Sequence, residues 1–298
     1  MDNVARNPDN YFLGTRRCSK EADGFEHYEW ISTTDASSIV NQLGAGLQSI
    51  FEMYAPEVNP ITKQQPLGIF STNRPEWILA EQAGFRYRKY IVGISDEIDF
   101  EQCMLQINEA DIRVLVCSID KIPPIFSRIE KMPNLKVIIS MDNFDLCKHT
   151  SASMSFNLND VNGLHAKAKS AGITLFDFKA VLEVGKSSSV PPMPPKPSDY
   201  SMLIFKTKTG NCPLGVLHTH ESIVHCSRSI YLSMETSIDA VVHLSHLPLA
   251  KEFEHSIVYM FMFGTVHIGF GSGSDERLID DMQFLHPTVL VALPNQLE

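Results

Sequence analysis

Apolar and polar residues follow two patterns along this chain, and together the patterns predict its elements. Short continuous apolar runs, typical of buried strands, occupy residues 67–71, 90–94, 113–117 and 135–140. Apolar residues at helical spacing predict helices at 37–54, 75–87, 99–109 and 121–130. Strands that alternate with helices are typical of a mainly parallel sheet covered by helices. The predicted fold class is therefore α/β.

The alternation stops and then resumes, which predicts a second part of the chain. Residues 143–170 are polar and irregular, as in a surface loop, and order returns at 173–184. Residues 186–198 hold five prolines and four serines, a composition that favours a linker or an extended strap. Further strands are predicted at 201–205, 241–245, 265–269 and 288–292. We therefore expect two packed subdomains, 1–185 with an irregular lead-in and 199–298, joined by a linker at 186–198.

Composition and charge narrow the class of protein. The chain has 298 residues, 44% of them hydrophobic and 20% charged, which is ordinary for a globular protein with a sizeable core. Its net charge of −10 argues against a nucleic-acid partner, because phosphate contacts need clustered lysine and arginine. The six cysteines form no C-x-x-C pair and fit neither a zinc site nor a dense disulfide framework. They indicate reduced thiols and an intracellular compartment.

The hydropathy of the chain predicts neither a signal peptide nor a membrane span. The first residues lack an apolar core of the kind that signal peptides have. The most apolar tract, Ile257–Phe270, contains His267 and is shorter than the ~20 residues that a transmembrane helix needs. It is more typical of a buried helix followed by a strand. We expect an intracellular protein, either cytoplasmic or associated with an organelle.

Residues 205–216 carry the most informative chemistry, with the sequence Phe-Lys-Thr-Lys-Thr-Gly-Asn-Cys-Pro-Leu-Gly-Val. They lie between a predicted strand and a predicted helix, for which Thr219 or Ser222 is a possible N-cap. A turn rich in hydroxyl groups and glycine at such a junction can wrap backbone N–H groups around phosphate. The candidate phosphate-binding residues are Thr207, Thr209, Gly210, Asn211 and Gly215. The structural alternative is an ordinary corner between a strand and a helix.

This segment resembles the signature loop of the acyl-activating, AMP-forming ligases, Tyr-Thr-Ser-Gly-Thr-Thr-Gly-x-Pro-Lys-Gly-Val. Thr209, Pro213, Gly215 and Val216 keep that pattern. Four other segments are similar to the long-chain fatty acyl-CoA synthetase branch of the family. They are Asn-Arg-Pro-Glu-Trp at 73–77, the strand at 135–142, Leu-Pro-Leu-Ala followed by Phe-Glu at 247–254, and the strand at 287–294.

The resemblance implies the fold of the N-terminal region of an acyl-adenylating enzyme. It also implies the family reaction, in which ATP, a fatty acid and CoA give acyl-CoA, AMP and diphosphate. ATP and Mg²⁺ would be the implied cofactors, CoA the co-substrate, and a fatty acid or other carboxylate the substrate.

The chain departs from the family pattern at several positions. Leu214 replaces the lysine of the loop, Lys208 replaces its first glycine, and Lys251 replaces the histidine that follows Leu-Pro-Leu-Ala. The sequence stops at Glu298, before the later motifs of the family. The resemblance therefore implies a truncated, degenerate member with little or no complete ligase activity alone, in effect a pseudoenzyme. No catalytic residue and no metal-binding residue are predicted.

Two other functions stay open. One is an active or partly active acyl-CoA ligase, and the other is a non-catalytic module that binds a fatty acyl group or a nucleotide. Possible partners are a full-length paralogue or a second copy of the chain. Lys206 and Lys208 either supply charge to the loop or are solvated. His220 is interpreted as a packing residue, 73–77 as structural, and Lys251 with Glu254 as a surface ion pair.

Overall fold

The computed structural model describes residues 8–17, 27–147, 161–206, 213–233, 241–273 and 275–294. The chain forms two compact units. Unit 1 consists of Met1–Ile39, Thr72–Ile78 and Glu221–Glu298. Unit 2 consists of Val40–Ser71 and Leu79–His220. Each unit therefore collects segments that lie far apart in the sequence.

Unit 2 is built on a seven-stranded sheet with the order β7-β6-β5-β3-β4-β8-β9. Neighbouring strands are parallel, except that β9 runs antiparallel to β8. The strands are β3 (Gln65–Phe70), β4 (Lys89–Ile94), β5 (Val114–Cys117), β6 (Val137–Ser140), β7 (Thr174–Asp177), β8 (Tyr200–Lys206) and β9 (Leu214–Thr219). Every residue of β4, β5 and β6 is buried, as expected for strands covered on both faces. The predicted α/β class is confirmed.

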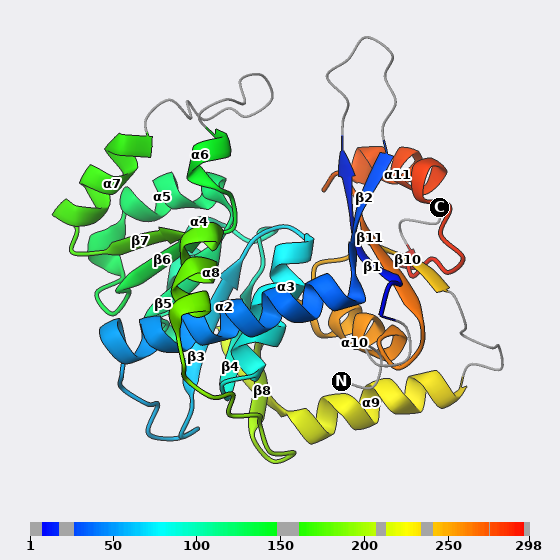
Figure 1. Cartoon of the computed structure of the whole chain (residues 1–298), viewed down its shortest axis with the longest axis horizontal. Helices are drawn as coiled ribbons and strands as arrows, with labels where there is room; N and C mark the ends of the chain where they lie inside the picture. The colour runs from blue at the N-terminus through cyan, green and yellow to red at the C-terminus, as the bar shows by residue number, and fades with distance from the viewer. Residues whose placement is uncertain are drawn as a thin grey trace, which may run out of the picture. The chain divides into compact units, whose positions relative to one another are not determined.

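Helices cover both faces of this sheet (Figure 1). On one face α4 (Phe100–Glu109), the short α5 (Ile122–Phe126) and α7 (Val161–Ser170) pack against the apolar side chains of the central strands. Asp99 caps α4, because its side chain accepts a hydrogen bond from the Gln102 backbone N–H. The other face is covered by α3 (Pro75–Phe85), α8 (Phe178–Ser187) and the part of α2 (Thr33–Tyr54) that belongs to unit 2.

Two glycines let α2 and α8 come unusually close. A Cβ atom on Gly46 would overlap the backbone carbonyl of Val181, and one on Gly185 would overlap the backbone carbonyl of Gln42. At both positions the added Cβ atom would meet backbone atoms, which cannot rotate away as the end of a side chain can. The two helices therefore pack backbone against backbone, and buried Leu43 and Leu47 continue the apolar face of α2.

Unit 1 contains a four-stranded sheet with the order β10-β11-β1-β2. β1 (Tyr11–Arg17) runs parallel to β11 (Val266–Phe270) and antiparallel to β2 (His27–Ser32), and β10 (Val241–Ser245) runs parallel to β11. The predicted lead-in thus supplies two strands. This unit also contains the first residues of α2 and α3, together with α10 (Glu252–Phe261), α11 (Leu278–Leu285) and α9 (His220–Ser233), whose first residue is counted in unit 2.

Two sequence predictions differ from the structure in detail, whereas the division of the chain at 186–198 stays a prediction. The strands β8 and β9 follow the proline-rich segment, and β8 pairs with β4 of the same sheet. Residues 143–170, predicted as a loop, include α7 and the short α6 (Phe144–Cys147). The predicted strand at 288–292 is reduced to one parallel bridge between His243 and Val289. Single helical turns complete the fold at Ile119–Lys121, Ile129–Lys131 and Asp275–Arg277.

Candidate functional site

The candidate phosphate loop connects β8 to β9. Four of its predicted residues, Thr207, Thr209, Gly210 and Asn211, lie outside the described residues, so their role stays a prediction. The fifth, Gly215, is the second residue of β9. Its backbone pairs with Phe205, and a Cβ atom there would press on the Leu203 side chain.

The antiparallel pairing of β8 and β9 fixes both ends of the loop. Lys206, the last residue of β8, is paired with Leu214, the first residue of β9. Paired residues of adjacent strands lie about 5 Å apart, so the loop leaves and re-enters the sheet at one point. The Leu214 side chain is 44% exposed there. The position that holds lysine in the resembling motif is therefore accessible and carries no charge.

The sequence predicts a helix directly after the loop, but the chain first forms β9. Thr219 ends that strand and immediately precedes α9, in the position expected for an N-cap, whereas Ser222 lies within the helix. His220 packs edge-on against the Phe85 ring, with ring centroids 4.6 Å apart. Its burial lowers the pKa of the imidazole to about 4, so His220 is neutral at physiological pH. This environment supports the interpretation of His220 as a packing residue.

The motif at residues 73–77 meets the motif at 247–254 within unit 1. The Asn73 amide donates hydrogen bonds to the Ser245 hydroxyl at 3.0 Å and to the Leu247 carbonyl at 2.6 Å. Its oxygen accepts one from the Leu249 backbone N–H at 3.0 Å. One side chain thus fixes the turn between β10 and α10. Trp77 is fully buried and packs edge-on against His255, as the structural interpretation of 73–77 predicts.

Replacing Asn73 with alanine should lower the free energy of unfolding by about 1–2 kcal/mol, because three hydrogen bonds to the 245–249 turn are lost. Urea denaturation of the whole chain would measure the change. Asn143→Ala is the matched control, since the Asn143 side chain accepts a local hydrogen bond from Asp145 at an exposed site. Equal losses in the two variants would contradict the role assigned to Asn73.

The predicted surface pair between Lys251 and Glu254 is wrong. Glu254 is fully buried and lies 3.0 Å from the Nε2 atom of His243, which is also fully buried, whereas Lys251 is exposed. The reason is that α10 begins at Glu252 and turns Glu254 toward β10. His243 was not singled out in the sequence, where it is one residue of an apolar strand. The sequence indicates its burial only by placing a histidine at an inward-facing position of a strand of valine and leucine.

Two features are absent from the described residues. These residues contain no helix that is long and apolar enough to cross a membrane. Within the same residues, no three His, Cys, Asp or Glu side chains are grouped so that they could hold a metal ion.

Comparison with known proteins identifies relatives that match most of this chain. The chain is 31% identical over 276 residues to long-chain-fatty-acid–CoA ligase 5 of Rattus norvegicus. The aligned region covers 91% of this chain and 37% of the relative. The chain therefore spans little more than a third of the length of that relative.

Solved structures share the fold at low sequence identity. The adenylation domain of a carboxylate reductase from Mycobacterium chelonae superimposes with a TM-score of 0.79 at 13% identity, over 96% of this chain and 44% of that one. The corresponding domain from Segniliparus rugosus, solved with AMP and a co-purified carboxylic acid, gives 0.75 at 12% identity, over 96% and 46%. The family model for AMP-binding enzymes matches residues 2–298. The ordered motifs, the fold and this match together place the chain in the AMP-binding enzyme family.

Proposed function

We propose that this chain carries part of the machinery of a long-chain fatty acid–CoA ligase and completes little or no ligation on its own. The observation that carries the proposal is Leu214, an exposed apolar side chain at the position of the loop lysine. The reaction develops charge on phosphate, so its rate depends on cations and N–H groups placed around that phosphate. An uncharged side chain at this position removes one such contact.

ATP and Mg²⁺ fit the described flank of the loop only in part. The hairpin geometry suits a phosphate loop, because both ends are held at one point of the sheet. The donor set suits it less, since Leu214 offers no N–H group from its side chain and the described lysine nearest the loop is Lys206. We therefore infer weak nucleotide binding, and we assign no reaction step to a described residue.

A pyrophosphate-release assay tests the proposal directly. The 298-residue chain is incubated with ATP, Mg²⁺ and a panel of fatty acids, with and without CoA, beside a complete ligase as positive control. We expect no release above background from this chain. Turnover with any of these acids would establish the alternative, an active or partly active ligase. A thermal shift with ATP but no pyrophosphate would instead favour a nucleotide-binding module.

Restoring the lysine should strengthen nucleotide binding. One charged hydrogen bond contributes about 1.5–3 kcal/mol, so Leu214→Lys is expected to bind ATP about 10- to 100-fold more tightly. Isothermal titration calorimetry with Mg²⁺–ATP would measure the change. Leu232→Lys is the matched control, because it adds the same charge on α9, where the native side chain is 69% exposed. Similar gains in the two variants would show a general charge effect and contradict the assigned position.

The substrate, partners and location belong to the same proposal. A fatty acid or another carboxylic acid is the proposed substrate, supported by the named activity of the rat relative and by the acid co-purified with the Segniliparus domain. The proposed partner is a full-length paralogue or a second copy of the chain. Cys103, Cys117 and Cys226 are free thiols, which favours a reducing intracellular compartment.

A further inference from the structure

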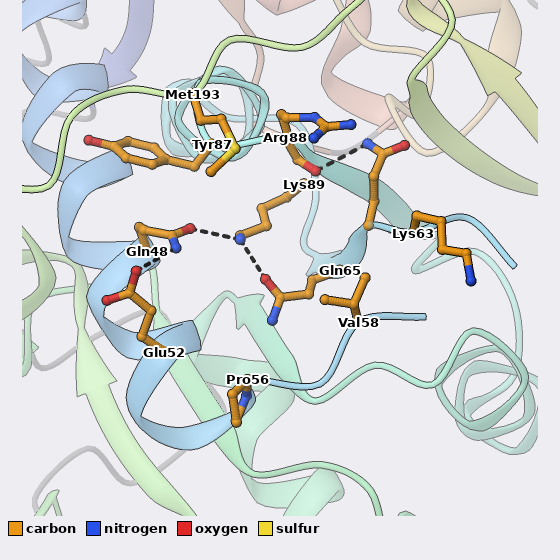
Figure 2. Close-up of a pocket in the computed structure, with 11 residues that line it drawn as sticks. Gln48, Glu52, Pro56, Val58, Lys63, Gln65, Tyr87, Arg88, Lys89 and Met193 are labelled. Carbon is orange, nitrogen blue, oxygen red and sulfur yellow. Dashed lines mark hydrogen bonds between the residues drawn. The ribbon is translucent and has the colours of Figure 1, made fainter. Parts of the chain in front are cut away.

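A pocket of about 380 Å³ in unit 2 contains a buried lysine (Figure 2). α2, the segment before β3, the start of β4 and the strap that follows α8 all line it. Lys89 opens β4 and is only 4% exposed. A buried ammonium group needs compensation for the water it has lost, so its surroundings indicate what the pocket is built to hold.

Neutral oxygen atoms receive the hydrogen bonds of this ammonium group. Lys89 Nζ donates to Gln48 Oε1 at 2.8 Å and to Gln65 Oε1 at 2.6 Å, and it lies 4.7 Å from the centroid of the Phe51 ring. An ammonium group has three N–H donors. Two are accounted for by the glutamines, which leaves one for a further acceptor.

Each glutamine is held in the orientation that faces the lysine. Gln48 Nε2 donates to Glu52 Oε1 at 2.8 Å, and Gln65 Nε2 donates to the Ala55 carbonyl at 2.7 Å. Figure 2 shows both amide oxygens turned toward Lys89 Nζ. Burial lowers the pKa of Lys89 to about 8, and the attraction of the Glu52 carboxylate opposes that shift only in part. The ammonium group is thus positioned while its charge is incompletely balanced.

The charged side chains of the pocket are mainly basic, although the chain as a whole carries a net charge of −10. Lys63, which is exposed, and Lys89 line the pocket together with one acid, Glu52. Arg88 also lines the pocket, but Asp199 accepts hydrogen bonds from its Nε at 2.9 Å and its Nη2 at 2.8 Å. The local balance is therefore positive, which favours an anion.

Part of the rim of the pocket is apolar. Val58 is 50% exposed and Met193 is 48% exposed, and both line the pocket together with Pro56. Small-molecule sites combine apolar walls with a few placed polar groups, and they start at about 300 Å³. The volume of this pocket suits a ligand with a short chain.

We propose that this pocket binds a small monocarboxylate, with its carboxylate on Lys89 Nζ and a short apolar body against Val58 and Met193. The carboxylate takes the third N–H of the ammonium group and supplies the negative charge that the two glutamines lack. Lys63 also lines the pocket, but it is exposed, so solvent screens its charge. The proposal does not depend on nucleotide binding by residues 205–216 or on ligase activity.

Calorimetric titration of the 298-residue chain with hexanoate tests the proposal. We expect one molecule to bind per chain, and at least tenfold weaker binding of hexan-1-ol, which lacks the charge, and of inorganic phosphate, which lacks the apolar body. Equal binding of the alcohol would overturn the contact with Lys89, and equal binding of phosphate would overturn the apolar contact. No heat of binding at millimolar hexanoate would overturn the site.

The pH dependence gives an independent measurement on the unaltered protein. Hexanoate stays ionised above pH 6, while free Lys89 loses its proton as the pH rises through about 8. Affinity should therefore fall up to tenfold for each pH unit above 8, until the raised pKa of Lys89 in the complex is passed. NMR of ¹³C-labelled lysine side chains should show that pKa rise when hexanoate is added. An unchanged Lys89 titration in the presence of bound hexanoate would contradict the proposal.

Lys89→Met should reduce hexanoate affinity at least tenfold. The matched control is Lys179→Met, since Lys179 is an exposed lysine of the same unit that lies 3.5 Å from Asp145. We expect the control to bind as the unaltered chain does. Equal affinities in the two variants would overturn the assignment, and the lysine titration decides the matter if Lys89→Met does not fold.

Discussion

Replacing Asp281 with alanine is expected to lower the free energy of unfolding of unit 1 by about 3–5 kcal/mol, the range for breaking a buried ion pair. Asp281 and Arg16 are nearly inaccessible, with side chains 4% and 3% exposed, and they form an ion pair. The second Asp281 oxygen accepts hydrogen bonds from the Ser272 backbone N–H at 2.8 Å and from its hydroxyl at 3.0 Å. The carboxylate therefore joins α11 to β1 and to the segment after β11.

Alanine at this position leaves the Arg16 guanidinium buried with one carboxylate fewer. It remains beside Asp280 at 2.7 Å and over the Phe284 ring at 4.3 Å, but neither replaces a buried carboxylate. Urea denaturation gives the loss. Asp280→Ala is the matched control, because this neighbour contacts the same arginine and is 42% exposed. It should cost under about 1 kcal/mol, and similar losses in the two variants would contradict the argument from burial.

Gly185→Ala is expected to destabilise unit 2 by about 2–3 kcal/mol, the upper range for overpacking. Alanine favours helix over glycine by about 0.5–1 kcal/mol, so intrinsic preference alone predicts the opposite sign. The added Cβ atom would overlap the backbone carbonyl of Gln42, and α2 and α8 would have to move apart. Gly46→Ala at the same contact should have an effect of the same sign.

Thermal unfolding followed by circular dichroism would measure the change in Gly185→Ala. The matched control is Gly84→Ala in α3, where a Cβ atom would first meet the ends of the Leu67 and Ile91 side chains at 3.0 and 3.1 Å. Those ends can rotate, so we expect a change within about 1 kcal/mol. A stabilised Gly185→Ala variant would show that the two helices have room to separate.

The elements that the sequence predicted best are those whose surroundings are uniform. The strands β3 to β6 are almost wholly buried, so each is a nearly continuous apolar run. The helix α4 keeps one apolar face, whereas α3 is buried nearly all round. The α/β class follows from that alternation. Pro75 at the first residue of α3 also marked a boundary that the structure confirms.

The elements that the sequence missed depend on partners elsewhere in the chain. β9 has an exposed or partly exposed residue at every position and is held by β8, so it lacks the apolar run of a buried strand. β1 lies in a polar lead-in and is a strand because β11 and β2 pair with its two edges. The second half of α7 consists of four polar or charged residues interspersed with alanine, a composition that is typical of a loop. It is a helix because its buried Leu164 and Ala168 pack against the sheet.

The sequence predicted the motif of the candidate site but not the contacts of the residues around it. The loop and its departure at Leu214 are visible in the sequence, and Gly215 is the one predicted site residue that the structure describes. The pair of His243 and Glu254 was missed because both side chains are buried by the packing of α10 on the sheet, and this packing is not visible in the sequence. The Lys89 pocket was missed because Gln48, Gln65 and Lys89 come from three separate elements.

Because β1 pairs with β11, this sheet can fold completely only after both strands have been synthesised. The strand that contains Leu13 has no parallel neighbour until Ile268 has been synthesised. At about 5–20 residues per second on the ribosome, that delay is on the order of 10–50 s, during which β1 and β2 can form at most a two-stranded hairpin. Such a hairpin is marginally stable in water. β1 and β2 therefore lack the rest of their sheet during that time, and the sheet is completed only after β11 has been synthesised.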